Sequence, residues 1–282
     1  MARPPRIEYP GALYHLTSRG NAQQLIFESP RDYETFLATL ELVVARYRWR
    51  CHTYCLLGNH YHLILETPDA NLALGMRQLN GTYAQGFNRR RGRVGHVFQG
   101  RYGAILVESQ RHLLQLSRYV VLNPVRAGLC RRPEEWRWSS YRAMIGAAPA
   151  PALLTVDWLL GSFGAKRGAA RRRYRRFVEE EVSESPWREL RSGIYLGSPQ
   201  FAEEAGARAR VSPEIPMVQR KPIRPQLADL LSRGEGAEIA VAHREHGYRL
   251  NEIASQLSVH YATIGRRLRA WENGRPMLQR KT

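Results

Sequence analysis

Two repeating patterns of apolar positions organise the first part of the chain. Alternation of apolar and polar residues, as in the segment 14–19, predicts strands, whereas apolar residues at every third or fourth position, as in 33–47, predict helices. Ser29-Pro30, just before that helical pattern, is a typical helix start. The predicted elements are strands at 14–19, 51–57, 60–66 and 104–107, and helices at 30–48, at 72–87 and from Ser109 onward.

The order of these elements is β-α-β-β-α-β followed by a helix. This order predicts an α+β fold with a ferredoxin-like, four-stranded antiparallel sheet and two helices on one face. The turn at Gly58-Asn59 predicts that the two middle strands form a hairpin. The other face of the sheet is left open for a functional site.

The strand after Gly58-Asn59 carries two histidines. Successive side chains of a strand alternate between faces, so His60 and His62 share the face of Ile64, opposite Tyr61 and Leu63. Two imidazoles placed in this way can bind one divalent cation and leave coordination positions open for a substrate oxygen. A strand with a merely polar face is the alternative that the spacing leaves open.

The third predicted helix carries a polar stripe beside its apolar one. The polar stripe consists of His112, Gln115, Tyr119 and Asn123. The hydroxyl of Tyr119 can reach a neighbouring site from this position, and Asn123 offers a carbonyl oxygen, although the proline after it disfavours continued helix. The alternative is an ordinary tyrosine of an amphipathic helix, in a chain with 14 tyrosines.

The charge of the chain points to a polyanionic partner. Its 282 residues include 43 Lys+Arg and 25 Asp+Glu, a formal net charge of +18, and the basic residues are mostly arginines. The three cysteines show no metal-binding spacing, which favours a reducing compartment. No apolar segment is long enough to cross a membrane and no secretory signal is visible, so we expect a cytoplasmic protein.

The segment 88–102, which connects the second predicted helix to the fourth predicted strand, contains arginines interspersed with aromatic residues. The spacing suits single-stranded nucleic acid, with guanidinium groups for the phosphates and rings for base stacking. A solvated loop is the alternative, but it would not need the rings. The residues predicted to bind DNA here are Arg89, Arg90, Arg91, Arg93, Phe98, Arg101 and Tyr102.

The rest of the chain is predicted to be helical. Proline-rich segments at 147–152 and 212–225 suggest three domains: a first domain at 1–145, a helical extension at 153–210, and a domain at 226–282. Within the last, a short helix, a tight turn at 258–260 and an arginine-bearing helix predict a helix-turn-helix, with a plain helical hairpin as the alternative. Its candidate DNA contacts are Tyr261, Thr263, Arg266, Arg267 and Arg269.

Several of these segments together resemble a known family. The combination resembles the REP-associated tyrosine transposases, a branch of the single-tyrosine HUH transposases. The matching segments are 14–21 (YHLTSRGN), 58–62 (GNHYH), 96–102 (HVFQGRY), 119–128 (YVVLNPVRAG) and 138–141 (WSSY). The resemblance covers roughly the first half of the chain and does not extend to the predicted helix-turn-helix.

The resemblance implies a metal-dependent single-stranded DNA endonuclease and strand transferase acting beside hairpin-forming repeats. It implies that His60 and His62 hold Mg²⁺ or Mn²⁺ and that Tyr119 is the nucleophile, forming a 5′-phosphotyrosine link. Asn123 stands where other HUH transposases have a glutamine as third ligand. Arg19, Asn21 and Arg126, within the matching segments, are further expected DNA contacts. The expected partners are single-stranded and hairpin DNA, at the nucleoid, for a monomer or homodimer.

A second hypothesis treats the chain as a non-catalytic, domesticated DNA-binding regulator. The presence of His60, His62 and Tyr119 together favours the enzyme, because a protein that only binds DNA has no need of all three. An RNA substrate is a third option that the sequence leaves open.

Overall fold

The computed structural model describes residues 7–180, 185–208 and 225–274. The chain divides at Pro199 into two compact units, and each is described by itself. The predicted helical extension at 153–210 crosses this division, and the linker residues 212–224 lie outside the described part of the chain.

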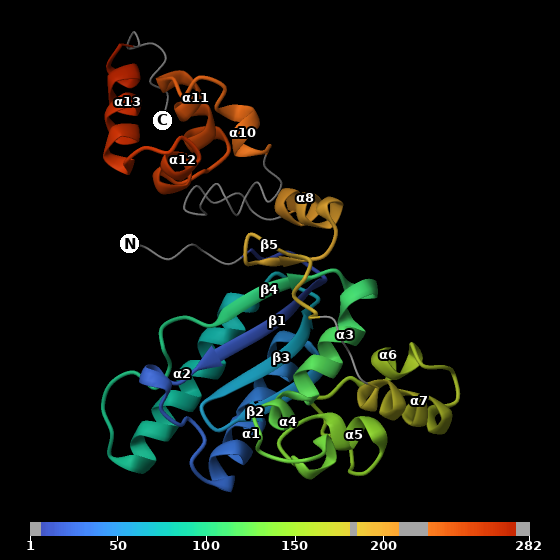
Figure 1. Ribbon diagram of the computed structural model, residues 1–282. Coiled ribbons are helices and arrows are strands. Elements are labelled where there is room, and N and C mark those ends of the chain that lie inside the picture. Colours follow the sequence, from blue (N-terminus) through green and yellow to red (C-terminus); the bar gives the residue numbers. More distant parts are fainter. Residues whose placement is uncertain (1–6, 181–184, 209–224, 275–282) are drawn as a thin grey trace. The chain divides into compact units, whose positions relative to one another are not determined.

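A six-stranded sheet forms the centre of the first unit (Figure 1). Its strands are β1 (Ala12–Arg19), β2 (Arg50–Leu57), β3 (His60–Thr67), β4 (Gly103–Val107), β5 (Leu190–Arg191) and β6 (Tyr195–Leu196). The order is β2-β3-β1-β4-β6-β5, and β6 lies parallel to β4 while all other neighbours are antiparallel. The four predicted strands are therefore present, but the prediction of a four-stranded antiparallel sheet is wrong: two short strands from beyond residue 189 extend it into a mixed sheet.

Helices cover both faces of this sheet. The main ones are α1 (Pro30–Tyr47), α2 (Leu72–Arg91) and α3 (Ser109–Val121). Tyr61 of β3 packs against Phe36 of α1, with ring centroids 4.7 Å apart, and donates a hydrogen bond to Asn80 of α2. The next residue, His62, instead contacts Tyr119 of α3. Because neighbouring residues of a strand point to opposite faces, α1 and α2 cover one face and α3 covers the other.

Most of the remaining elements of the first unit are short. These remaining elements are η1 (Asn21–Gln23), α4 (Asn123–Arg126), η2 (Pro133–Glu135), α5 (Tyr141–Ile145), α6 (Val156–Gly161) and α7 (Arg167–Glu179). Trp136 donates a hydrogen bond from its indole to the Leu56 carbonyl, and Trp138 stacks on Tyr33 at 4.4 Å. These tryptophans attach the segment after α4 to β2, at the edge of the sheet, and to α1.

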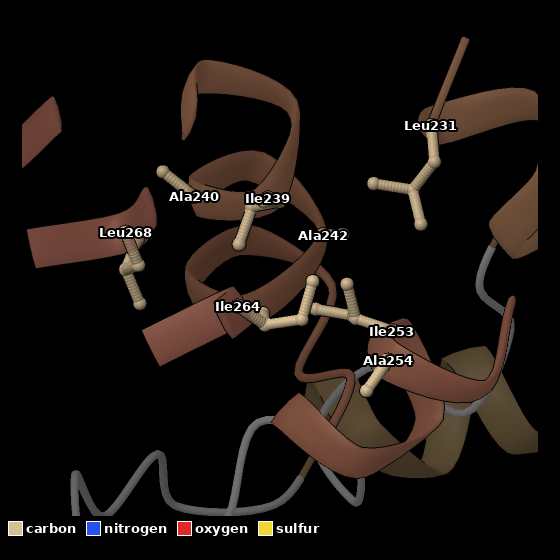
Figure 2. Close-up of a cluster of buried hydrophobic side chains, with 8 residues drawn as sticks. All are labelled: Leu231, Ile239, Ala240, Ala242, Ile253, Ala254, Ile264 and Leu268. Carbon is tan, nitrogen blue, oxygen red and sulfur yellow. The ribbon is translucent and has the colours of Figure 1, made fainter. Parts of the chain in front are cut away.

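The second unit is helical and has an apolar core of its own (Figure 2). Its helices are α8 (Pro199–Arg208), α10 (Leu227–Leu230), α11 (Gly236–Ala240), η3 (Val241–Glu245), α12 (Leu250–Gln256) and α13 (Tyr261–Asn273). Ile239, Ile253 and Ile264, one from each of three helices, meet fully buried in that core. Among the described residues of both units, no helix has the length and apolar content needed to cross a bilayer.

Candidate functional site

Two histidines from neighbouring strands meet on the sheet face covered by α3. His62 lies on β3, is 8% exposed, and shares a 3.0 Å hydrogen bond between its Nδ1 and the Nε2 of His15 on β1. The two rings are stacked, with centroids 5.2 Å apart. They meet because β1 and β3 are antiparallel neighbours in which His15 lies opposite Ile64, so both histidines point to the same face. The sequence interpretation missed His15.

His60 stands at the first position of β3, beside His62. It is half-buried, and its ring centroid lies 5.1 Å from that of His62. Its Nδ1 is 2.7 Å from the side-chain oxygen of Asn59. Arg19, at the end of β1, pairs with His60 in the sheet register, which places one predicted DNA-binding residue next to a predicted metal ligand.

Burial keeps these imidazoles neutral at neutral pH. It lowers the pKa of His15 to about 3, since a charged ring would lose its hydration. The pKa of His62 is well below its usual value because of burial and, to a smaller extent, the neighbouring His15 and His60. Burial and the positive charge of Arg19 lower the pKa of His60. Neutral imidazoles keep a lone pair, which is the form that binds metals.

Tyr119 lies next to the histidines because α3 is amphipathic. Leu113, Leu116 and Val120 of this helix are buried and hold it on the sheet. The Tyr119 ring, half-buried, then lies with its centroid 6.2 Å from that of His62. The Arg126 guanidinium lies over this ring, 4.6 Å from its centroid, and donates a hydrogen bond to the Tyr119 carbonyl. The structure thus brings together His60, His62 and Tyr119, three residues that the sequence assigned to chemistry.

Trp187 is a second residue of this site that the sequence interpretation missed. It precedes β5, and its ring lies 5.1 Å from Tyr119 and 5.0 Å from His15. No local pattern signals this position, because it depends on the later strands β5 and β6 joining the sheet beside β4.

Asn123, the predicted third ligand, is the first residue of α4. Its amide nitrogen donates hydrogen bonds to the carbonyls of Tyr119 at 3.0 Å and Val120 at 3.3 Å. These bonds orient the amide and commit its nitrogen, so the oxygen is the atom that remains for a ligand. In the part of the chain that the structure describes, no three His, Cys, Asp or Glu side chains are arranged to hold a metal ion. A cation bound by His60 and His62 would therefore need oxygen ligands such as this amide or the substrate.

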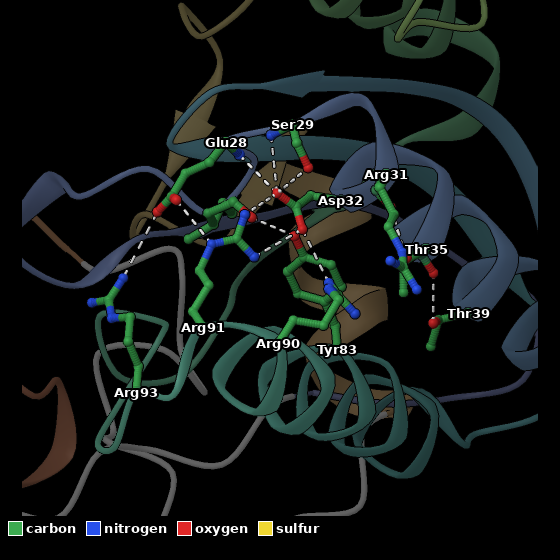
Figure 3. A network of polar contacts seen from close by, with 11 residues as sticks. Glu28, Ser29, Arg31, Asp32, Thr35, Thr39, Tyr83, Arg90, Arg91 and Arg93 are labelled. Atoms are coloured by element: carbon green, nitrogen blue, oxygen red, sulfur yellow. Dashed lines mark hydrogen bonds and ion pairs between the residues drawn. The ribbon is translucent and has the colours of Figure 1, made fainter.

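The arginines at the end of α2 are largely committed within the protein (Figure 3). Arg90 and Arg91 both form ion pairs with the buried carboxylate of Asp32 at the start of α1. Arg91 and Arg93 also pair with Glu28. Arg90 and Arg91 thereby join α2 to the start of α1, and Arg93 contacts the segment before α1, whereas Arg89 is exposed. That these arginines bind phosphates stays a prediction.

The aromatic residues of the same loop are also turned inward. Phe98 and Tyr102 are each 8% exposed, and Phe98 packs near Tyr61 and Tyr83 at 6.2 Å. Their predicted use as base-stacking rings is therefore wrong for this structure, because the rings belong to the core. Asn21 and Arg101 are exposed on the surface, as a DNA contact requires.

The helix α13 presents part of its predicted contact residues. Tyr261 is 56% exposed, and Arg266 and Arg269 are exposed, whereas Thr263 is half-buried. Arg267 is exposed as well; it donates a hydrogen bond to the Gly234 carbonyl, as Arg269 does to the Gly265 carbonyl. The side chain of His260 caps the helix by accepting from the Ala262 backbone, and Ser258 in the preceding turn has a left-handed backbone with φ of 52°.

Comparisons with known proteins cover the segment that builds this site. Residues 9–123 match the model of the family described as "Transposase IS200 like". A putative REP-associated tyrosine transposase of Haemophilus influenzae is 25% identical over 139 residues, which are 45% of this chain and 77% of that protein. A solved structure of a REP-associated tyrosine transposase bound to a REP hairpin aligns with a TM-score of 0.45 and 16% identity, over 55% of this chain and 92% of that one.

These matches confirm the resemblance to the REP-associated tyrosine transposases that the sequence motifs indicated. The matched segment begins just before β1 and ends at Asn123, so it contains the two predicted metal-binding histidines and Tyr119. The segment with the two histidines and Tyr119 is thus similar to transposases of the IS200 type.

Proposed function

We propose that the protein is a metal-dependent single-stranded DNA endonuclease and strand transferase of the HUH type, with Tyr119 as its nucleophile. One observation carries the proposal: the Tyr119 ring lies 6.2 Å from that of His62, within the segment that matches a transposase family. The strand order β2-β3-β1-β4 agrees with a ferredoxin-like catalytic domain extended by two strands.

The proposed reaction exchanges one phosphodiester bond for another. The Tyr119 oxygen attacks the phosphorus and forms a 5′-phosphotyrosine bond, while the bond to the 3′ oxygen breaks. The phenol gives up its proton and the departing 3′ oxygen gains one. The new phosphodiester retains the energy of the broken bond, so a 3′-hydroxyl can later attack it and rejoin the strands.

His60, His62 and the amide oxygen of Asn123 are the proposed ligands of Mg²⁺ or Mn²⁺. The donor set fits, because both imidazoles are held neutral and the Asn123 amide nitrogen is already committed to backbone carbonyls. When bound, the ion supplies Lewis-acid polarisation of the scissile phosphate. Free tyrosine side chains in model peptides have a pKa of about 10 and are weak nucleophiles at neutral pH, which is why this chemistry calls for such help.

The proposed substrate is single-stranded DNA beside a hairpin, acted on at the nucleoid in the cytoplasm. Arg19 and Arg126 lie next to the site, where they suit the phosphates that flank the scissile bond. The similar solved protein was bound to a REP hairpin. We further propose that α12 and α13 act as a helix-turn-helix on the duplex stem, through Tyr261, Arg266 and Arg269.

Incubation of the protein with end-labelled hairpin oligonucleotides and Mn²⁺, followed by a denaturing gel, tests this function. The proposal expects a covalent protein–DNA band that disappears with EDTA and in the Tyr119→Phe variant, while that variant still binds DNA. Tight binding of several hairpins with no covalent band from the wild type would instead support the non-catalytic regulator.

A further inference from the structure

The hydrogen bonds around His60 determine which of its nitrogens carries the proton. The Asn59 amide nitrogen donates to the Gln23 carbonyl at 3.2 Å, so the Asn59 amide oxygen is the atom facing His60. An amide oxygen only accepts hydrogen bonds. The His60 Nδ1, 2.7 Å from that oxygen, must therefore carry the proton, and the lone pair of the neutral ring is on Nε2.

The pair formed by His15 and His62 has two arrangements. Either the Nδ1–H of His62 donates to the Nε2 of His15, or the Nε2–H of His15 donates to the Nδ1 of His62. Only the first arrangement leaves a lone pair on the Nε2 of His62. In both arrangements the Nδ1 of His15 is buried without a hydrogen-bond partner among the described residues. The surroundings of this atom therefore do not show which arrangement is present.

Binding a cation requires the first arrangement. The Nδ1 of His62 is occupied by His15, so His62 can bind a metal only through Nε2. Metal-binding histidines commonly donate their other N–H to an acceptor that fixes the ring and its tautomer. That acceptor is usually a carboxylate, a carbonyl or water; here the neutral ring of His15 stands in its place.

We propose that His15 and Asn59 are positioning residues, which hold His62 and His60 as Nδ1–H tautomers so that both present the Nε2 lone pair to one divalent cation. His15 acts through His62 and does not bind the ion. The inference rests on the proposed metal site, and it assigns to Asn59 and His15 the roles that determine whether that site can form.

The tautomers can be measured directly on the metal-free protein. Long-range ¹H–¹⁵N correlation spectra of histidine-labelled protein distinguish Nδ1–H from Nε2–H rings, and the His15→Phe and His60→Gln variants assign the signals. We expect Nδ1–H tautomers for His60 and His62. An Nε2–H signal for His62 would overturn the proposal.

Titration of Mn²⁺ alone by calorimetry provides the second readout. The His15→Phe variant, which keeps a ring but has no acceptor, should bind Mn²⁺ roughly 10–100-fold more weakly. The His15→Gln variant retains an acceptor oxygen and should recover most of the affinity. His52→Phe is the matched control, because it removes another buried histidine of the same sheet, one that packs against Trp158. Thermal unfolding verifies that each variant is folded.

Equal losses in the His15→Phe and His15→Gln variants would contradict a role as acceptor, and unchanged affinity in a folded His15→Phe would contradict any role. Neither measurement contains DNA. A protein with the expected tautomers and Mn²⁺ response that does not cleave DNA would therefore refute the proposed function and leave this inference intact. Conversely, DNA cleavage by a protein whose His62 is an Nε2–H tautomer would support the proposed function and refute this inference.

Discussion

The two faces of the central sheet differ sharply although the same strands build both. Towards α1 and α2 the sheet presents Tyr61, which packs against Phe36 of α1, and Phe36 in turn packs against Tyr83 of α2; all three rings are fully buried. Towards α3 it presents His15 and His62, with Tyr119 against them. One face is an apolar core, and the other has two buried histidines beside a half-buried tyrosine.

On β3, residues that stabilise the fold thus alternate with residues of the proposed active site. Burial of the aromatic face stabilises the fold by about 25 cal/mol per Å² of apolar surface removed from water. Buried neutral imidazoles contribute little of this kind, and an imidazole deprived of hydrogen-bond partners destabilises the native state. The apolar face thus offsets the cost of burying polar rings on the other face of the same strands.

Adjacent residues of β3 provide the sharpest way to separate the two faces. We expect His62→Ala to reduce DNA cleavage by roughly 10³-fold or more, since a metal supplies several kcal/mol of charge stabilisation. Tyr61→Phe, one residue away, should leave cleavage within a few-fold and lower the free energy of unfolding by about 1–2 kcal/mol, because the Asn80 oxygen loses its donor. Cleavage rates and urea unfolding of the two variants test this contrast. A large cleavage defect in Tyr61→Phe would contradict the separate roles of the two faces.

Phe36→Ala should disrupt the packing of the apolar face without affecting the histidine face. Its ring is fully buried between Tyr61, Tyr83 and Phe27, so its removal is expected to destabilise the protein by about 3–5 kcal/mol. Denaturant unfolding measures this loss. The Mn²⁺ affinity of the folded fraction should stay unchanged, and a parallel loss of affinity would show that the faces are coupled.

Asp32 links the helices of the apolar face in a pH-dependent way. Burial would raise the pKa of this carboxyl, but hydrogen bonds from Arg91, the Glu28 backbone, Arg90 and Ser29 outweigh it and lower the pKa to about 2, from 3.8. A folded-state pKa below the unfolded one means stability that is present above pH 3.8 and lost as the pH falls towards 2. The stability difference between wild type and Asp32→Asn should therefore narrow by about 2 kcal/mol between about pH 5 and about pH 2. A difference that stays constant over this range would contradict the assignment.

The smallest expected effect concerns neighbouring arginines with different roles. Arg89 is exposed, whereas Arg91 pairs with Asp32 and Glu28. If Arg89 contacts a phosphate, Arg89→Gln should reduce the slope of log affinity for single-stranded DNA against log salt by roughly 0.7. Arg91→Gln should leave that slope unchanged and lower the unfolding temperature. Fluorescence anisotropy at several salt concentrations distinguishes the two variants. Equal changes of slope in both would refute the different roles assigned to Arg89 and Arg91.

The sequence predicted local elements and faces well, because these depend on short-range periodicity. The hairpin of β2 and β3, the helices α1 to α3, and the shared face of His60 and His62 were all visible in it. His15 could have been found only with the register of β1 against β3, which places it opposite Ile64 on the histidine face. That register comes from tertiary pairing rather than from local pattern.

Long-range partners explain the other differences. The arginines at the end of α2 were predicted to bind DNA from local charge alone. Asp32, which is far away in sequence, forms ion pairs with two of them. Phe98 was predicted to stack on bases from a loop, whereas its contacts with Tyr61 and Tyr83 place its ring in the core. Trp187 reaches Tyr119 only because β6 joins the sheet beside β4.

Mass spectrometry of the trapped protein–DNA product tests the central claim most directly. After nuclease and trypsin digestion, cleavage following Arg118 and Arg126 releases the peptide 119–126, which contains Tyr119 as its one tyrosine. Our account predicts a nucleotide remnant linked through phosphate to Tyr119 on this peptide. A remnant on any other residue would show that the tyrosine beside the histidines is not the nucleophile.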